Sequence, residues 1–338
     1  MKKQTSLFLI LLIVWTACVP SSRYEQSLNQ SEVNRGELER VVAHYDSLDN
    51  TKKRRAAIFL IENMTDKQSI VIHDSTAYYD LLRCLSTVND PIGWDPAFSV
   101  VHKSIDSILL VFPQRITMSR DLQTIKADYL INNIDSAFHV WNNVSWSKNY
   151  TFEEFCQYVL PYKLDSEELE GWRELVLCHK ASAEDSLLQK KASPWEMAVL
   201  LINNTEFHYN IGMGRFPYPM NLSDLNLIKM GTCDHMANLA LYYFRSRGIP
   251  SAIDLLPAWA NRSSSHTWNV VILPNKKVRS IGYQSNGINR LAYKVSKIYR
   301  KMYEVQPLPA LTDNEVLPPF FAQGDHCCPI KIQNSSLK

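Results

Sequence analysis

The feature that most constrains the fold of this chain is an amphipathic helix that begins at a cysteine. After Cys233 the apolar residues recur at the helical spacing i, i+3, i+4, i+7 and i+8, at Met236, Leu239, Ala240, Tyr243 and Phe244. Gly248 and Pro250 end this pattern, because glycine favours the left-handed conformation that follows a helix and proline cannot continue one. A helix with one apolar face must pack on a second layer of secondary structure.

The segments after the helix predict strands of an antiparallel sheet. They span residues 251–256, 266–273 and 278–284. Because alternate side chains of a strand share a face, His266 lies on the same face as Trp268, Val270 and Ile272. The expected fold class is therefore α+β, with the histidine at the open end of the sheet reaching over the helix start.

A cysteine at a helix start and a histidine on a neighbouring strand suggest nucleophilic chemistry. The thiolate is the reactive form of cysteine, and the positive end of a helix dipole lowers a thiol pKa. Backbone N–H groups at the same helix end supply donors for an oxyanion. Cys233 as nucleophile and His266 as general base would form the pair that performs acyl transfer.

The order of these elements resembles the transglutaminase-like branch of the papain-type cysteine enzymes. The resemblance rests on Gly231-Thr-Cys233, on the helix end that leads to Gly-Ile-Pro250, and on His266-Thr-Trp-Asn-Val, 33 residues after the cysteine. It covers residues 195–299, about a third of the chain. It implies a papain-like core, with Cys233 as nucleophile and His266 as general base. It also implies cleavage or transfer at an amide bond of a peptide, protein or glycopeptide through a thioester.

The sequence departs from this family at the third catalytic position. Family members place an aspartate near the end of the strand that follows the histidine strand, where it orients the imidazole. This chain has Gly282 there, and residues 261–300 contain no Asp or Glu. Loss of the carboxylate weakens stabilisation of the imidazolium, so an inactive binding or scaffold module with the same cleft is the alternative to an enzyme.

An amide side chain is the expected substitute for the missing aspartate. If the hairpin closes with a three-residue loop, Gln284 and Asn286 fall on the His266 face and Gln284 lies opposite Trp268. A register change of one residue brings Tyr283 and Ser285 to that face instead. Gln284 is the orienting residue that we predict.

The N-terminus predicts export. Lys2 and Lys3 precede an apolar run over 7–15 that is too short to span a bilayer, which is typical of a signal peptide over residues 1–17. Cys18 follows a small residue and resembles the lipidated cysteine of a bacterial lipobox, although a tryptophan stands where the lipobox usually has leucine. We therefore expect a lipid anchor at Cys18 in the cell envelope, periplasmic or on the outer membrane. Ordinary cleavage or an uncleaved anchor are the alternatives.

The remaining chain divides by composition and periodicity. A polar tether is predicted over 18–35, a mainly helical region over 36–180 and the transglutaminase-like domain over 190–300. Residues 301–338 show no strand pattern and are predicted to be a C-terminal tail, either complete or truncated.

Charge and the remaining cysteines exclude other functions. Lys+Arg 36 against Asp+Glu 34 gives a formal charge of +2, without the basic stripe that nucleic-acid binding needs. Cys84, Cys156 and Cys178 fall in apolar patterns and are predicted to be core thiols, while Cys327 and Cys328 match no zinc spacing. No phosphate loop, serine elbow or His-Glu-x-x-His motif is present, so no metal or cofactor is predicted.

Overall fold

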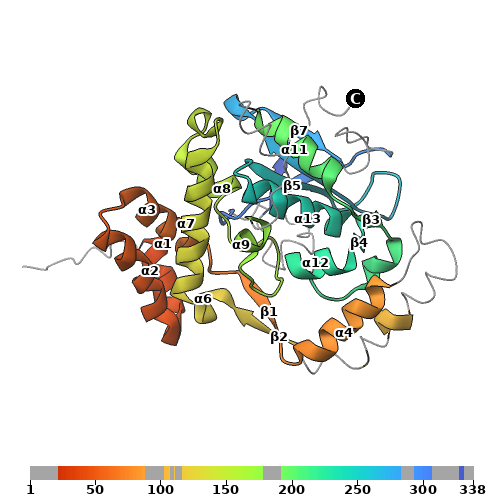
Figure 1. The fold of residues 1–338 in the computed structure, drawn as a ribbon, viewed down its shortest axis with the longest axis horizontal. Coiled ribbons are helices and arrows are strands. Elements are labelled where there is room, and N and C mark those ends of the chain that lie inside the picture. The colour runs from red at the N-terminus through yellow and green to blue at the C-terminus, as the bar shows by residue number, and fades with distance from the viewer. Residues whose placement is uncertain are drawn as a thin grey trace, which may run out of the picture.

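The computed structural model describes residues 22–87, 103–106, 110, 116–177, 192–282, 293–306 and 327–330. It is a mixed helical and sheet structure, which confirms the α+β class (Figure 1). The helices are α1 (Arg23–Gln30), α2 (Arg35–Ser47), α3 (Thr51–Glu62), α4 (Ser75–Ser86), α6 (Asp121–Thr124), α7 (Ala127–Asn143), α8 (Phe152–Tyr158), α9 (Trp172–Leu177), α11 (Pro194–Asn204), α12 (Leu222–Ile228) and α13 (Cys233–Ser246). The strands are β1 (Gln68–Ile72), β2 (Ile116–Arg120), β3 (His208–Tyr209), β4 (Met230–Gly231), β5 (Ser251–Leu256), β6 (His266–Ile272), β7 (Val278–Ile281), β8 (Ile298–Lys301) and β9 (Cys327–Ile330).

The largest sheet of the described chain is antiparallel, with strand order β7-β6-β5-β8-β9. Its strands β5, β6 and β7 confirm the predicted hairpin segments. The expectation that residues 301–338 contain no strand is wrong, because β9 pairs with β8. This pairing joins segments far apart in the sequence, so local periodicity did not reveal it.

Helices α11 and α13 cover one face of this sheet, and both contact β6 (Figure 1). Val271 of β6 and Ile281 of β7 pack there against Ala240 and Phe244 of α13. On the opposite face a separate cluster forms from Ala252, Leu256, Trp259, Trp268, Val270, Ile272 and Ile298. The sheet is therefore buried on both faces, as its almost continuous apolar strands require.

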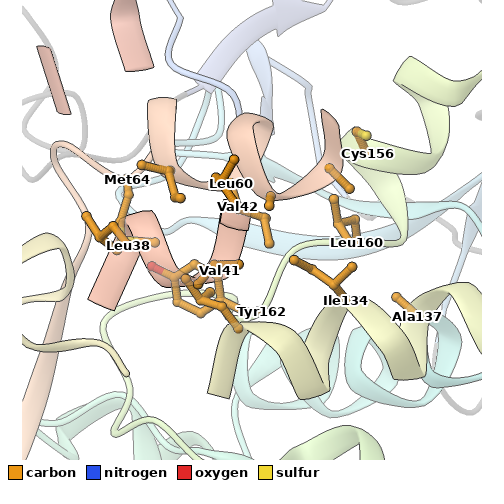
Figure 2. Close-up of a cluster of buried hydrophobic side chains, with 14 of the residues drawn as sticks. Leu38, Val41, Val42, Leu60, Met64, Ile134, Ala137, Cys156, Leu160 and Tyr162 are labelled. Carbon is orange, nitrogen blue, oxygen red and sulfur yellow. The ribbon is translucent and has the colours of Figure 1, made fainter. Parts of the chain in front are cut away.

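The N-terminal helices pack around their own core. Figure 2 shows Leu38 and Val42 of α2, Leu60 of α3 and Ile134 of α7 pointing toward one another. These four residues are at most 6% exposed, so each helix buries an apolar face in this core. Cys156 of α8 lies in the same core, which confirms the prediction of a structural thiol.

The predicted tether over 18–35 is wrong for its described part. Ser22 caps α1 by accepting a hydrogen bond from Glu25 N at 3.2 Å, and Leu28 of α1 is buried in the N-terminal core. A capped helix with a buried leucine belongs to the folded body. The polar composition of this segment reflects the exposed face of α1, where most of its residues lie.

The predicted division into two domains near residue 180 does not follow the packing. Trp146 packs with Met197 and Phe244 in one core cluster, and its Nε1 donates to Gly248 O at 2.8 Å. Tyr303 returns to the N-terminal core, where its hydroxyl donates to Leu60 O. The two predicted halves therefore share hydrophobic cores. The N-terminal region, predicted to be mainly helical, also contains the small antiparallel pair β1–β2.

The other cysteines lie in different parts of the chain. Cys84 is exposed on α4, so the prediction of a core thiol is wrong. Cys178 lies outside the described residues, and Cys327 and Cys328 belong to β9. The predicted signal peptide and Cys18 lie outside the described residues as well.

No helix among the described residues has the length and apolar character needed to cross a membrane.

A buried ion pair joins α6 to the segment after α8, and Ser69 of β1 forms hydrogen bonds with both partners. Lys163 Nζ lies 2.9 Å from Asp121 Oδ2 and 2.7 Å from Ser69 Oγ, and Asp121 also accepts from Ser69 Oγ at 2.6 Å and from Tyr162 OH at 2.7 Å. Lys163 is 4% and Asp121 0% exposed. A charge buried this deeply depends on its partner, since water cannot replace it.

Substitution Asp121→Ala is therefore expected to lower the free energy of unfolding by about 3–5 kcal/mol, because it leaves Lys163 buried without its partner. The matched control is Asp128→Ala, which removes an exposed pair with Arg40 and should cost less than about 1 kcal/mol. Urea unfolding of both variants measures the difference. Equal costs for the two substitutions would contradict the importance of the buried pair.

Candidate active site

The turn before α13 is built around a histidine cap. His235 Nδ1 lies 3.1 Å from Thr232 N and 3.0 Å from Thr232 Oγ1, which closes a capping box at the helix start. Burial lowers the pKa of His235, and a ring nitrogen that accepts from a backbone N–H must be neutral. His235 is thus a capping residue.

Gly231 is required by this cap. A Cβ atom at position 231 would lie 2.4 Å from the Cβ and 2.7 Å from the Cγ of His235. No real side chain tolerates contacts this short, so glycine precedes the cysteine for a packing reason. The Gly-x-Cys motif therefore has a local structural cause in this chain.

Cys233 is half-buried at the first position of α13, and several groups act on its thiol. Burial and the negative charge of Asp234 raise the pKa of Cys233 to about 11. The backbone N–H groups of Thr267, Asp234 and Cys233 lower it, but by less. The expectation of a lowered thiol pKa is therefore wrong, because desolvation and an adjacent carboxylate outweigh the donors at the helix start.

Strand β6 is tied to α13 through its odd-numbered residues. Thr267 Oγ1 donates to Asp234 Oδ1 at 2.5 Å, and Asn269 Nδ2 donates to Ala237 O at 2.8 Å. His266 and Trp268 alternate with these residues, so they belong to the other face of the strand. The expectation that the histidine face packs on the helix is wrong. The Cys233 thiol lies at the end of β6, where the Thr267 N–H acts on it.

The ring of His266 lies between two tryptophans. Its centroid is 5.7 Å from that of Trp259 at an interplanar angle of 19°, and 5.5 Å from that of Trp268 at 28°. Trp259 and Trp268 are 7% and 4% exposed, while His266 is half-buried. This stacking fixes the plane of the imidazole and leaves its edge as the polar part of the ring.

The register of β7 decides which residue faces His266. Asn269 pairs with Ile281 and Val270 with Ser280, so the next position places Gly282 opposite Trp268. The predicted pairing of Gln284 with Trp268 is therefore wrong by two residues. Gly282 therefore shares the His266 face. Gln284, the predicted orienting residue, and Asn286 lie outside the described residues.

A carboxylate that sequence reasoning missed lies on the preceding strand. Asp254 of β5 pairs with Trp268 in the sheet and so shares the His266 face. Arg300 occupies both of its oxygens, since Nε donates to Oδ1 at 2.7 Å and Nη2 to Oδ2 at 2.9 Å. Asp254 is thus bound in a bidentate ion pair with β8.

Tyr209 is a second residue near the thiol that the sequence did not indicate. Strand β3 pairs with β4 in parallel, which sets Tyr209 beside Gly231. Burial raises the pKa of Tyr209, and the charges of Cys233 and Asp234 raise it further, so the phenol lies close to both. A two-residue strand carries no periodicity to detect. His208, the other residue of β3, is exposed.

Among the described residues no group of His, Cys, Asp and Glu side chains is arranged to hold a metal ion. Comparisons of the chain with family models, curated proteins and solved structures found no match.

Substitution Gly231→Ala is expected to destabilise the protein by about 1–3 kcal/mol, because the new methyl group must displace His235 from its cap. The control is Gly36→Ala in α2, where a Cβ meets nothing within 4 Å. That change should raise stability by about 0.5–1 kcal/mol through helix propensity. Thermal unfolding distinguishes them, and a neutral Gly231→Ala variant would contradict the packing role.

Alkylation of Cys233 by iodoacetamide is expected to accelerate with pH up to about 11, following its raised pKa. At pH 8 the rate should be at least about tenfold below that of a model thiol, whose pKa is near 8.5. Asp234→Asn removes a charge that raises the thiol pKa and should increase the rate at neutral pH several-fold.

The measurement uses a Cys84→Ser background, because Cys84 is exposed, with peptide mass spectrometry to assign the modified residue. A rate at pH 7 equal to that of the model thiol would contradict the raised pKa.

Proposed function

We propose that this chain is a cysteine-dependent acyl-transfer enzyme of the transglutaminase-like, papain-like type. It would act on an amide bond of a peptide, a protein side chain or a glycopeptide. The observation that carries the proposal is the position of the Cys233 thiol at the start of α13, beside the backbone N–H of Thr267. This is where a helix start supplies both a nucleophile and hydrogen-bond donors. Thr267 follows His266 in β6.

The raised pKa of Cys233 determines how the first step must proceed. A thiol with a pKa of about 11 is protonated at neutral pH, so the base must remove the proton during attack. The Cys233 sulfur bonds to the amide carbon while its proton moves to an imidazole nitrogen of His266. The backbone N–H groups at the helix start stabilise the negative carbonyl oxygen. The C–N bond then breaks, and the leaving amine takes the proton back from His266.

The thioester then passes its acyl group to an acceptor. Water yields a carboxylic acid, an amine yields a new amide, and Cys233 recovers its proton in either case. Hydrolysis is the outcome we favour for an exported protein, because water is present in excess. The lipid anchor at Cys18 and the cell-envelope location are part of this proposal and follow from the N-terminal sequence.

A binding or scaffold module is the second candidate, and specific observations favour it. Gly282 occupies the position expected for the aspartate, and Arg300 engages both oxygens of Asp254. Without a carboxylate partner the protonated imidazole is less stable, which slows catalysis. In this candidate function the site binds peptide without cleaving it.

Incubation of the wild type and Cys233→Ala with cell-wall peptides and proteins tests the enzyme function. Mass spectrometry should detect released or cross-linked products, and a thioester on Cys233, with the wild type only. His266→Gln should lower the rate by about 10²–10⁴-fold, as loss of a general base does. Cys84→Ala, which removes an exposed thiol on α4, is the matched control and should retain full activity.

Equal product formation by the wild type and Cys233→Ala would contradict the proposal. Saturable peptide binding without any product would support the binding module instead.

A further inference from the structure

A cavity of about 100 Å³ lies beside the C-terminal half of α13, away from Cys233. It is bounded by Gln68 of β1, by residues 163–166, by Leu241 of α13 and by Ile253 of β5. Arg245, which also lines it, follows Cys233 by 12 residues, which corresponds to about 18 Å along a helix. The cavity is therefore separate from the candidate active site.

Four cationic side chains line this cavity, Lys67, Lys163, Arg245 and Lys301, against the two acids Asp66 and Asp165. Two of the cations have acidic partners: Lys163 lies 2.9 Å from Asp121, and Lys301 lies 3.3 Å from Asp165. Lys67 lies 5.0 Å from the centre of the Tyr303 ring. The fourth cation, Arg245, is buried.

Arg245 is 6% exposed and uses few of its donors. A guanidinium carries five N–H groups, and within the described chain Arg245 makes one side-chain hydrogen bond, from Nη1 to Lys163 O at 3.3 Å. Its Nε is buried without a hydrogen-bond partner. Burial lowers the pKa of Arg245 to about 10, so the side chain is still charged at neutral pH.

The acid that acts electrostatically on this guanidinium makes its hydrogen bonds elsewhere. Glu167 interacts electrostatically with Arg245, but its carboxylate accepts hydrogen bonds from Leu164 N at 2.8 Å, Asp165 N at 2.7 Å and Tyr242 OH at 2.9 Å. These three donors hold the carboxylate toward its own loop and toward Tyr242. A buried charged donor without a partner is costly, and such groups are rare in folded proteins.

We propose that this cavity binds a small oxyanion, a carboxylate or a phosphate group, through the guanidinium of Arg245, with Lys301 at the edge of the cavity. The planar guanidinium matches both groups in geometry. The volume suits a group of about five heavy atoms, since an engineered cavity of about 150 Å³ holds benzene. Met118, which is 52% exposed, lines the cavity as well and marks its solvent side, where the rest of a larger ligand would extend.

Isothermal titration calorimetry of the full chain with inorganic phosphate and with acetate tests this site. Sodium chloride keeps the ionic strength constant, so that only specific binding contributes. One-site binding is expected for at least one of the two anions. Arg245→Met should weaken it at least tenfold, and Lys301→Gln several-fold, because Lys301 is only partly exposed and close to the cavity.

Two controls make the outcome decisive. Arg83→Met removes an exposed arginine of α4 that pairs with Asp80, and it should bind the anion like the wild type. Cys233→Ala should also bind like the wild type, which separates this site from the proposed active site. Circular dichroism verifies that each variant is folded, and Lys301→Gln carries the test if Arg245→Met is not.

Absence of one-site binding by both anions would overturn the proposal, as would unchanged affinity in Lys301→Gln. Loss of binding in Cys233→Ala would place the anion at the other site and would overturn it too.

Discussion

The packing of α13 on β6 is the constraint on which the rest of this structure depends. Asn269 donates to Ala237 O, and Thr267 donates to Asp234, so the first turns of the helix are fixed to the start of the strand. The helix also contacts β5, α7, α9, α11 and α12. Its side chains enter three separate hydrophobic clusters, so it is buried on nearly all sides. A helix held this way brings Cys233 to a fixed place at the end of the sheet.

The chemistry available at that place is set by competing electrostatic effects. Backbone N–H groups favour a thiolate, while burial and Asp234 favour the thiol, and the thiol prevails. Asp234 has a structural role, because it accepts the hydrogen bond that fixes Thr267. The same carboxylate therefore fixes Thr267 and raises the pKa of the Cys233 thiol. A resting thiol of this kind requires a base that acts during the reaction, and His266 is the residue that we propose for that task.

Sequence periodicity predicted much of this fold, and it failed where contacts are not local. The limits of β5 agree with the predicted segment, and the stripe of α13 is real, because both depend on neighbouring residues. The stripe understated the burial of α13, since Ala237, Leu241 and Tyr242 face other elements that no local pattern reveals. The pairing of β9 with β8 and the sharing of cores across residue 180 depend on long-range contacts and were missed.

In the candidate site, too, the features set by local sequence were predicted and those set by long-range contacts were not. Cys233 at the helix start and His266 at the strand start follow from sequence, because helix and strand boundaries are local. The face of β6 that meets the helix, the raised thiol pKa and the pairing of Asp254 with Arg300 depend on tertiary packing. Tyr209 was missed for a related reason, since a two-residue strand becomes visible only through its partner β4.

The central claim is that His266 removes the proton from a Cys233 thiol whose pKa is about 11. The most direct measurement is the rate of Cys233 acylation by an activated ester as a function of pH, in the wild type and in His266→Gln, followed by intact-protein mass spectrometry. With His266 acting as base, the wild type is acylated faster than His266→Gln at neutral pH, where the Cys233 thiol is still protonated. The His266→Gln rate is lower and continues to rise toward about pH 11. Identical pH profiles for the two proteins would contradict the claim.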